Sequence, residues 1–382
     1  MLAAHTALFF VIMTAAIFHL IPAKNWNLRL SVVILTSLFL IYAVYPIAAL
    51  AGVGFAVYSW VIYRFSISNP KVRKYAPLTL FLLLAFFSYF DFKVERDFYR
   101  TTIINFGMSF YTFRLYGALR MSLRLKEETT LAEFLALTLF FPIFAAGPIA
   151  YQDSFRAALD KPFLYSDWVM GFLRVCAGVF FVHFVSAQLT ELLYEFSQGR
   201  TENFRWHRME AWKVYLVMML KFLNLYADFT GYTEIAIGLG LFFGFRIPEN
   251  FRFPLFTRNI QDFWKRWHLS LSNFIVTYLY LPLAVQFRKP RLALFMSFTL
   301  VGLWHQISWQ YLVWGVGHGA ALIAYQEFSK LKFHRSVPAG VKLAIMPIAT
   351  IVTLSYVAFL SAFANEVSLA KSLSFLRALV GL

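Results

Sequence analysis

The stretch "VGLWHQISWQYLVWGVGHGA", residues 301–320, is apolar, aromatic or glycine at most positions and places a histidine, His305, directly after a tryptophan. Similar apolar runs recur along the whole chain. Of the 382 residues, 60% are hydrophobic and only 14% are charged, a composition typical of polytopic membrane proteins. Because hydrocarbon solvates an imidazole poorly, His305 is a candidate functional residue.

Apolar runs broken by charged residues predict an all-α, polytopic integral membrane protein with roughly ten or eleven transmembrane or re-entrant helices. The runs cover residues 3–23, 28–50, 52–66, 76–92, 101–119, 131–151, 166–194, 211–245, 270–287, 292–328 and 340–364. We expect a single integral membrane domain, 1–382, made of N-terminal helices (1–100), a core (101–328) and a C-terminal helical region (329–382). The first run has neither a basic leader nor a cleavage site, so we expect a retained helix and not a signal peptide.

The formal net charge of +16 comes from Lys and Arg in the short breaks between apolar runs, such as 68–75, 124–128, 198–210 and 288–291. Positive-inside bias explains this pattern, so we expect a multi-pass protein of the cytoplasmic membrane without a nucleic-acid partner. A basic cytosolic face would also attract an anionic co-substrate such as a nucleotide-bearing thioester. The single cysteine, Cys176, excludes an intramolecular disulfide.

Glycine and proline interrupt several runs at membrane depth, as in "FFPIFAAGPIAY" (140–151) and at Gly315, Gly317 and Gly319. Irregular backbone is tolerated there only when it is buried in protein or lines a cavity. These interruptions therefore predict an internal chamber.

Ionisable side chains within apolar surroundings are functional candidates by default. Asp228 and Glu234 flank Gly231 in such a run, although pairing with an arginine at a helix end would explain them equally well. The segment "IQDFWKRWHLSLS" (260–272) predicts an interfacial amphipathic helix in which Asp262 and Arg266 pair. In such a helix His268 would lie one turn after Trp264 and contact it, or bond a backbone carbonyl at the helix end.

A buried neutral imidazole at His305, with one nitrogen held by a partner, has the arrangement that a general base requires. A structural histidine that bonds a neighbouring helix is the alternative, and for His318, set among glycines, close helix packing is the simpler interpretation. In a continuous helix Trp309 would follow His305 by one turn. Motifs for phosphate loops, serine hydrolases and metal sites are missing from the sequence, so from the residues alone a membrane enzyme and a transporter both remain possible.

Three stretches together resemble the membrane-bound O-acyltransferase family, in particular its bacterial branch of alginate O-acetylation and teichoic-acid D-alanylation subunits. They are "YADFTGYTEIAIGLGLFFGFRIPENF", "RNIQDFWKRWHLSLS" and "GLWHQISWQYLVWGVGHG", with weaker support from 105–120 and 140–155. The resemblance implies a helical bundle around a central tunnel, with 101–328 as the acyltransferase core. It implies that His305, in the Gly-Leu-Trp-His motif, is the general base and that His268, in the Arg-Trp-His motif, is also catalytic. The residues expected to bind substrate or line the tunnel are Trp304, Gln306, Trp264, Asp228, Tyr232, Asn259 and Arg258.

The chain departs from the alginate pattern at Val276 and Thr277, where an Arg-Asp pair is usual, and at Gln306, where a glycine is usual. A Gly-Gly-Asn-Arg element that usually follows is absent. Donor or partner docking is expected to differ accordingly, and Gln306 adds an amide beside the expected base.

The resemblance implies an enzyme of the bacterial inner membrane that moves an acyl group, preferably acetyl, from a cytosolic thioester to a hydroxyl outside the cytoplasm. The expected donor is acetyl-CoA or a carrier-protein thioester, with no bound cofactor and no metal. The expected partners are membrane lipid, an extracytoplasmic acyltransferase and a cell-envelope polysaccharide acceptor. The alternatives are D-alanyl transfer from a carrier protein to teichoic acid, a transporter, and a scaffold that anchors a secreted transferase.

Overall fold

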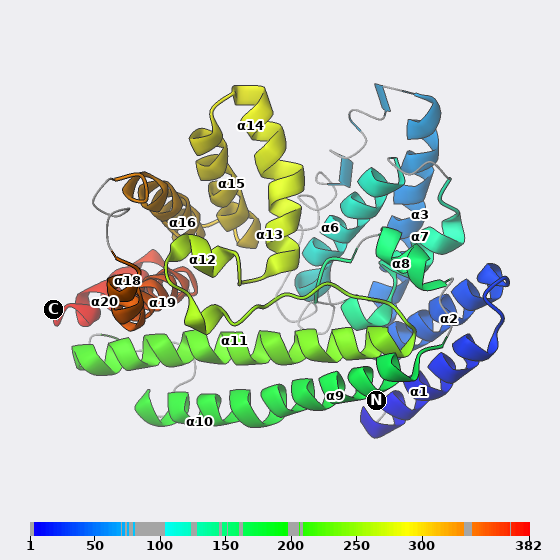
Figure 1. The fold of residues 1–382 in the computed structure, drawn as a ribbon, viewed down its shortest axis with the longest axis horizontal. Helices are drawn as coiled ribbons and strands as arrows, with labels where there is room; N and C mark the ends of the chain where they lie inside the picture. The colour runs from blue at the N-terminus through cyan, green and yellow to red at the C-terminus, as the bar shows by residue number, and fades with distance from the viewer. Residues whose placement is uncertain are drawn as a thin grey trace. The chain divides into compact units, whose positions relative to one another are not determined.

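The computed structural model describes residues 4–69, 71–72, 75, 79–80, 104–123, 128–144, 147–150, 152–159, 163–197, 206, 209–331, 338–366 and 368–382. The regular elements of these residues are helices, so the predicted all-α class is confirmed (Figure 1). They group into two compact units, of which unit 1 comprises Met1–Gly178 and Tyr232–Glu249, and unit 2 comprises Val179–Gly231 and Asn250–Leu382. The single domain expected from the sequence stays a prediction. The expected run 76–92 and most of the loops at 124–128 and 198–210 lie outside the described residues.

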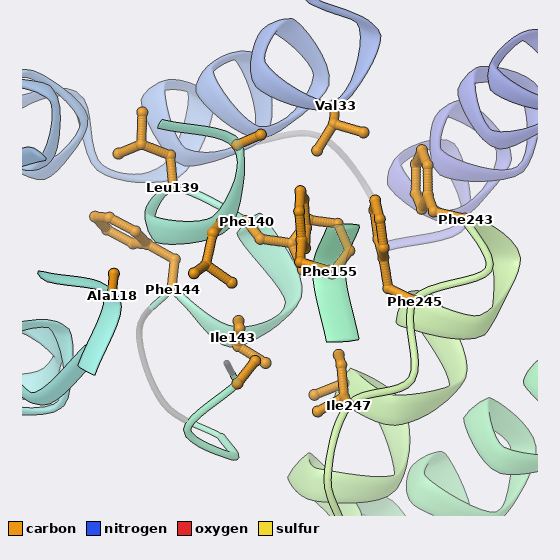
Figure 2. Close-up of a cluster of buried hydrophobic side chains, with 14 of the residues drawn as sticks. Val33, Ala118, Leu139, Phe140, Ile143, Phe144, Phe155, Phe243, Phe245 and Ile247 are labelled. Carbon is orange, nitrogen blue, oxygen red and sulfur yellow. The ribbon is translucent and has the colours of Figure 1, made fainter. Parts of the chain in front are cut away.

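Unit 1 is built on helices that pack in sequence order, α1 on α2 and α2 on α3, with α7 against both α2 and α3. Its elements are α1 (Ala4–Leu20), α2 (Trp26–Val44), α3 (Pro46–Ser68), α6 (Ile104–Ser122), α7 (Leu131–Thr138), η1 (Phe141–Ile143), α8 (Gln152–Leu159), most of α9 (Tyr165–Phe180) and the end of α11 (Ala211–Phe242). Phenylalanine rings fill its core, as Figure 2 shows for Phe140, Phe155 and Phe245. The rings of Phe155 and Phe245 stack with centroids 4.0 Å apart. Van der Waals contact between these rings stabilises this core.

Unit 2 carries the remaining helices, and α15 packs against α14 and α16 (Figure 1). Its elements are η2 (Phe181–Ser186), α10 (Ala187–Phe196), the first part of α11, η4 (Pro254–Phe256), α12 (Ile260–Trp264), α13 (Leu269–Ile275), η5 (Val276–Tyr280), α14 (Leu281–Phe287), α15 (Pro290–His305), α16 (Trp309–Phe328), α18 (Ala339–Ala344), α19 (Met346–Ala364) and α20 (Leu369–Leu379). Glycines allow α15 and α16 to approach closely, since a Cβ added at Gly315 would lie 2.5 Å from the carbonyl oxygen of Phe298. This contact places the end of α15 beside the start of α16.

Five helical segments of the described chain are long and apolar enough to cross a membrane. They are Trp26–Val44, Ala48–Ser68, Tyr165–Phe196, Leu269–Phe287 and Met346–Ala364. The multi-pass membrane character is therefore confirmed. The total of ten or eleven spans and the central tunnel stay predictions.

Several predicted spans have different boundaries in the structure. The run 28–50 is divided at Tyr45, because Pro46 lacks an amide proton and occupies the first turn of α3. The run 131–151 holds only the eight-residue α7, after which Pro142 lies in a 3-10 turn and Gly147 adopts a left-handed φ of 112°. Both the missing amide and the left-handed backbone are incompatible with a continuing helix.

The run 292–328 is divided into α15 and α16, so Trp309 begins a new helix and does not follow His305 by one turn. Gln306 is extended, and the Ser308 hydroxyl accepts a hydrogen bond from the Tyr311 amide at 3.3 Å, which caps α16. A serine cap satisfies an amide that has no partner within the helix. The polar residues after His305 thus mark a turn within an otherwise apolar run.

Arg174 of α9 joins two carboxylates of unit 1, as one of the two sequence interpretations of Glu234 predicted. Its Nη1 lies 3.0 Å from Glu234 Oε2, and its Nη2 lies 2.5 Å from Glu249 Oε1. The Arg174 and Glu234 side chains are only 26% and 22% exposed. Charged groups taken out of water need such a partner, so this pairing anchors the end of α11 to α9.

We expect Arg174→Met to destabilise the protein by about 1–3 kcal/mol, because it leaves two carboxylates without their shared cation. Arg64→Met is the matched control, since Arg64 pairs with Glu128 and both side chains are exposed, at 46% and 64%. Exposed pairs contribute less than about 1 kcal/mol. Thermal unfolding in one detergent measures both variants, and equal losses of stability would refute this assignment.

Candidate active site

His268 lies at a break between two short helices and not within one amphipathic helix. α12 ends at Trp264, and α13 begins at Leu269 with His268 as its N-cap residue in the left-handed region, at φ 44° and ψ 55°. The prediction of one continuous helix over 260–272 is therefore wrong. The predicted pair inside it is confirmed, with Arg266 Nε 2.8 Å from Asp262 Oδ1.

His268 is almost fully buried in unit 2, with 6% of its surface exposed. Its Nδ1 lies 3.3 Å from Oδ1 of Asn250, which has no exposed surface. The ring of Phe229, on α11, meets the imidazole edge-on with centroids 4.8 Å apart. Asn250 was not among the site residues expected from the sequence, because its contact with His268 spans 18 positions and leaves no local pattern.

His305 is the last residue of α15; its side chain keeps accessible surface, yet protein atoms surround it closely, as expected for the buried imidazole that the sequence suggested. The helix ends there, so the ring stands at the accessible end of the α15–α16 turn. Three aromatic rings flank it, with centroid distances of 4.5 Å to Trp304, 5.7 Å to Tyr311 and 5.3 Å to Trp314. An accessible imidazole held between rings can be reached by a substrate hydroxyl and has a restricted orientation.

A cluster of four rings, which we call the His–Trp cluster, runs inward from this point through His305, Trp314, His318 and Trp264. The Trp314 ring centroid lies 4.5 Å from that of His318, and the Trp264 indole Nε1 donates to His318 Nδ1 at 3.3 Å. His318 on α16 is fully buried, and its bond to α12 confirms that it joins neighbouring helices. A contact between Trp264 and His268 was one of two alternatives from the sequence, and in the structure the Trp264 indole N–H donates to His318.

The two histidines assigned by resemblance both lie in unit 2. Trp264, four residues before His268, lies with its ring centroid 6.0 Å from that of Trp314, which in turn contacts His305. Two segments that are far apart in the sequence thus meet in unit 2. The catalytic roles of the two histidines stay predictions.

The other expected site residues lie in different surroundings. Trp304 contacts His305, and Gln306 is the exposed C-cap residue that follows α15. Asn259 caps α12 by accepting from the Asp262 amide at 2.8 Å, and the Arg258 amide donates to the Asp262 carboxylate at 3.0 Å. Their observed bonds are therefore those of a helix start, and substrate contact by either residue stays a prediction.

Asp228 and Tyr232 both lie on α11, Asp228 in unit 2 and Tyr232 in unit 1. Asp228 is exposed, whereas Phe229 is the neighbouring residue that contacts His268. Tyr232 belongs to unit 1, where its ring lies 3.5 Å from the position that a Cβ on Gly147 would occupy. Among the described residues, no three His, Cys, Asp or Glu side chains are grouped so that they could hold a metal ion.

We expect Trp264→Phe to destabilise the protein by about 1–3 kcal/mol, because it keeps an aromatic ring but leaves His318 Nδ1 buried without a donor. Trp309→Phe is the control, since Trp309 is 69% exposed. The measurement is thermal unfolding followed by intrinsic fluorescence. If both variants unfold at the wild-type temperature, the Trp264–His318 bond contributes nothing to stability.

Comparisons with known proteins show similarity over a segment that includes both His268 and His305. The model of the MBOAT family, membrane-bound O-acyltransferase, matches residues 72–359. The chain is 29% identical to the peptidoglycan O-acetyltransferase of Helicobacter pylori, over 91% of this chain and 73% of that protein. It is 30% identical to the probable alginate O-acetylase of Azotobacter vinelandii, over 80% of this chain and 64% of the relative. It is 28% identical to the teichoic acid D-alanyltransferase of Bacillus subtilis, over 66% of each chain.

Proposed function

Because the chain belongs to the membrane-bound O-acyltransferase family, we propose that it moves an acetyl group from a cytosolic thioester to a hydroxyl outside the cytoplasm. The acceptor is a cell-envelope polysaccharide or a partner protein, and the enzyme works in the bacterial inner membrane. The observation that carries the proposal is the contact between the segments of His268 and His305, made by Trp264 and Trp314 within the family match.

In the proposed reaction the imidazole of His305 accepts the proton of the acceptor hydroxyl. The hydroxyl oxygen then attacks the thioester carbonyl carbon, an O–C bond forms, the C–S bond breaks, and the proton passes to the thiolate. A base within hydrogen-bonding reach of the hydroxyl typically contributes about 10²–10⁴-fold to such a step. The exposed position of His305 between Trp304 and Trp314 suits this role, because it combines access with a restricted ring orientation.

Acetyl is the favoured acyl group, because two of the compared relatives are named as O-acetylating enzymes of envelope polymers. The teichoic acid D-alanyltransferase of Bacillus subtilis supports D-alanyl transfer from a carrier protein as the second candidate. The chain spans 64% to 73% of the length of these three relatives. Acetyl-CoA as donor and the polysaccharide acceptor therefore belong to the proposal. Family membership favours an enzyme over the transporter that the sequence alone left open.

The donor is tested with protein reconstituted in nanodiscs, with envelope polysaccharide and the soluble extracytoplasmic fraction present as acceptor, and offered either acetyl-CoA or a carrier protein loaded with D-alanine. We expect free thiol to be released from acetyl-CoA at a rate proportional to enzyme concentration, and no release from the loaded carrier. Release from the carrier alone would replace acetyl by D-alanyl. Release from neither donor, by protein that unfolds cooperatively, would contradict the proposed chemistry.

An extracytoplasmic partner acyltransferase is part of the proposal, with the acyl group passing through a hydroxyl of that partner to the polymer. Membrane vesicles with and without the soluble extracytoplasmic fraction test it. We expect radiolabelled acetyl to reach the polymer only when that fraction is present. Full-rate labelling of the polymer by the membrane protein alone would show that no partner is needed.

A further inference from the structure

We propose that Asn250 is a positioning residue that holds the His268 imidazole in its Nδ1–H tautomer and keeps the lone pair on Nε2. The structural part of this inference stands on the contacts of unit 2. Its catalytic meaning rests on the proposed function, since only acyl transfer gives His268 a reaction to serve.

Asn250 is built into the backbone around His268. Its carbonyl oxygen accepts from the Leu269 amide at 2.9 Å. Its side-chain Oδ1 lies 2.6 Å from Ser270 Oγ, 3.4 Å from the Ser270 amide nitrogen and 3.3 Å from His268 Nδ1. Asn250 and Ser270 are 0% and 1% exposed, so water has little access to compete for these bonds. Asn250 thus hydrogen-bonds to Leu269, to Ser270 and to the His268 imidazole.

The Ser270 backbone N–H, which can only donate, determines the tautomer of His268. An asparagine amide can be placed with either its oxygen or its nitrogen toward a partner, and a hydroxyl can donate or accept. A backbone N–H can only donate, so the atom that faces the Ser270 amide must be the oxygen. An oxygen of this kind only accepts, and His268 Nδ1 must then be the donor. A neutral imidazole with its proton on Nδ1 carries its lone pair on Nε2.

The backbone conformation of His268 explains why these hydrogen bonds are needed. A non-glycine residue in the left-handed region is strained by roughly 1–2 kcal/mol. The bonds from Asn250 to Leu269 and Ser270 hold the chain on both sides of this conformation. The ring of Phe229, on α11, packs at a near right angle to the imidazole. The ring is therefore fixed in place, and its tautomer decides which nitrogen can serve the reaction.

Nitrogen-15 spectra of the eight histidines test the tautomer directly in the full-length protein. Protein labelled with ¹⁵N-histidine is reconstituted in nanodiscs at pH 8, and the His268 signals are assigned from their loss in His268→Gln. Protonated and unprotonated ring nitrogens differ clearly in chemical shift. We expect Nδ1 of His268 to be protonated and Nε2 unprotonated. A protonated Nε2 with an unprotonated Nδ1 in the wild-type protein would overturn the inference.

Two variants of Asn250 distinguish the effect of its side-chain oxygen from the effect of its side-chain volume. We expect Asn250→Leu to move at least half of the His268 population to the Nε2–H tautomer, and Asn250→Asp, which keeps an oxygen, to leave the proton on Nδ1. Asn224→Leu is the control, since Asn224 bonds Ser186 and Thr190 in the same unit. An unchanged Nδ1–H signal in a folded Asn250→Leu protein would overturn the inference. If Asn250→Leu does not fold, loss of the Nδ1 proton in Asn250→Asp would do the same.

Activity is measured in a separate experiment. A failure of the proposed acyl transfer can then be distinguished from a failure of the proposed role of Asn250. If acyl transfer holds, we expect Asn250→Leu to lower kcat by about 10–100-fold, the scale on which residues that orient a reactive histidine act, with the KM for acetyl-CoA unchanged. Asn250→Asp is expected to restore most of that loss. A correct tautomer in a protein without any activity contradicts the proposed function and leaves the structural role of Asn250 standing.

Discussion

We expect His305→Ala to lower the rate of thiol release from acetyl-CoA by about 10²–10⁴-fold, the range that a positioned general base contributes. The structure gives the reason, because His305 is the accessible member of the His–Trp cluster and ends α15 at the turn before α16. Removing its ring leaves the hydroxyl with no base at that position. The substitution also removes ring contacts with Trp304, Tyr311 and Trp314, so we expect a modest fall in the unfolding temperature of a protein that still unfolds cooperatively.

His183→Ala is the matched control for this prediction. His183 is also an exposed histidine of unit 2, but it lies on η2 and not in the His–Trp cluster. We expect its kcat to stay within about twofold of the wild-type value, as for surface substitutions away from a site. His305→Gln adds a side chain of similar length that cannot act as a base, and it should remain as inactive as the alanine variant. Activity retained in His305→Ala would remove His305 from the chemistry and revive the scaffold interpretation.

The second large effect is expected at Gly302, where α15 meets α16. A Cβ added there would lie 2.2 Å from the carbonyl oxygen of Tyr311 and 3.0 Å from the amide nitrogen of Gly315. Both are backbone atoms, so no side-chain rotation can relieve the overlap, and the two helices must separate. We expect Gly302→Val to destabilise the protein by about 3 kcal/mol or more and to abolish activity, because His305 lies one turn further along α15.

Gly54→Val makes the same chemical change at a helical glycine where no heavy atom lies within 4 Å of the added Cβ. We expect it to leave stability unchanged or slightly raised, because valine has a higher helix propensity than glycine by less than about 1 kcal/mol. Thermal unfolding in detergent compares the two variants. Equal melting temperatures for Gly302→Val and Gly54→Val would show that close packing of α15 on α16 does not stabilise the fold.

The features predictable from the sequence are those that depend on neighbouring residues. Long apolar runs predicted membrane-spanning helices, and the four-residue spacing of Asp262 and Arg266 predicted their ion pair, which forms at 2.8 Å. The glycines around His318 predicted close helix packing, as observed at Gly315. These signals are local, and local signals survive when the chain folds.

The features that were missed depend on contacts between distant residues. The break at His268 is stabilised by Asn250, whose position before "FRF" resembles that of any loop asparagine. The link from His305 to His318 passes through Trp314, which looks like one more apolar residue of a spanning helix. Periodicity reports the burial of a residue but not its partner, so the positioning contacts of the site needed the three-dimensional structure.

The most direct test of the central claim follows the acetyl group across the membrane. Sealed vesicles receive radiolabelled acetyl-CoA on the cytosolic face and envelope polysaccharide, with the soluble extracytoplasmic fraction, in the opposite compartment. We expect label on the polysaccharide in vesicles that carry the wild-type protein and background label in those that carry His305→Ala. Equal labelling by the two proteins, or labelling only when donor and acceptor share one compartment, would contradict acyl transfer across the membrane by this enzyme.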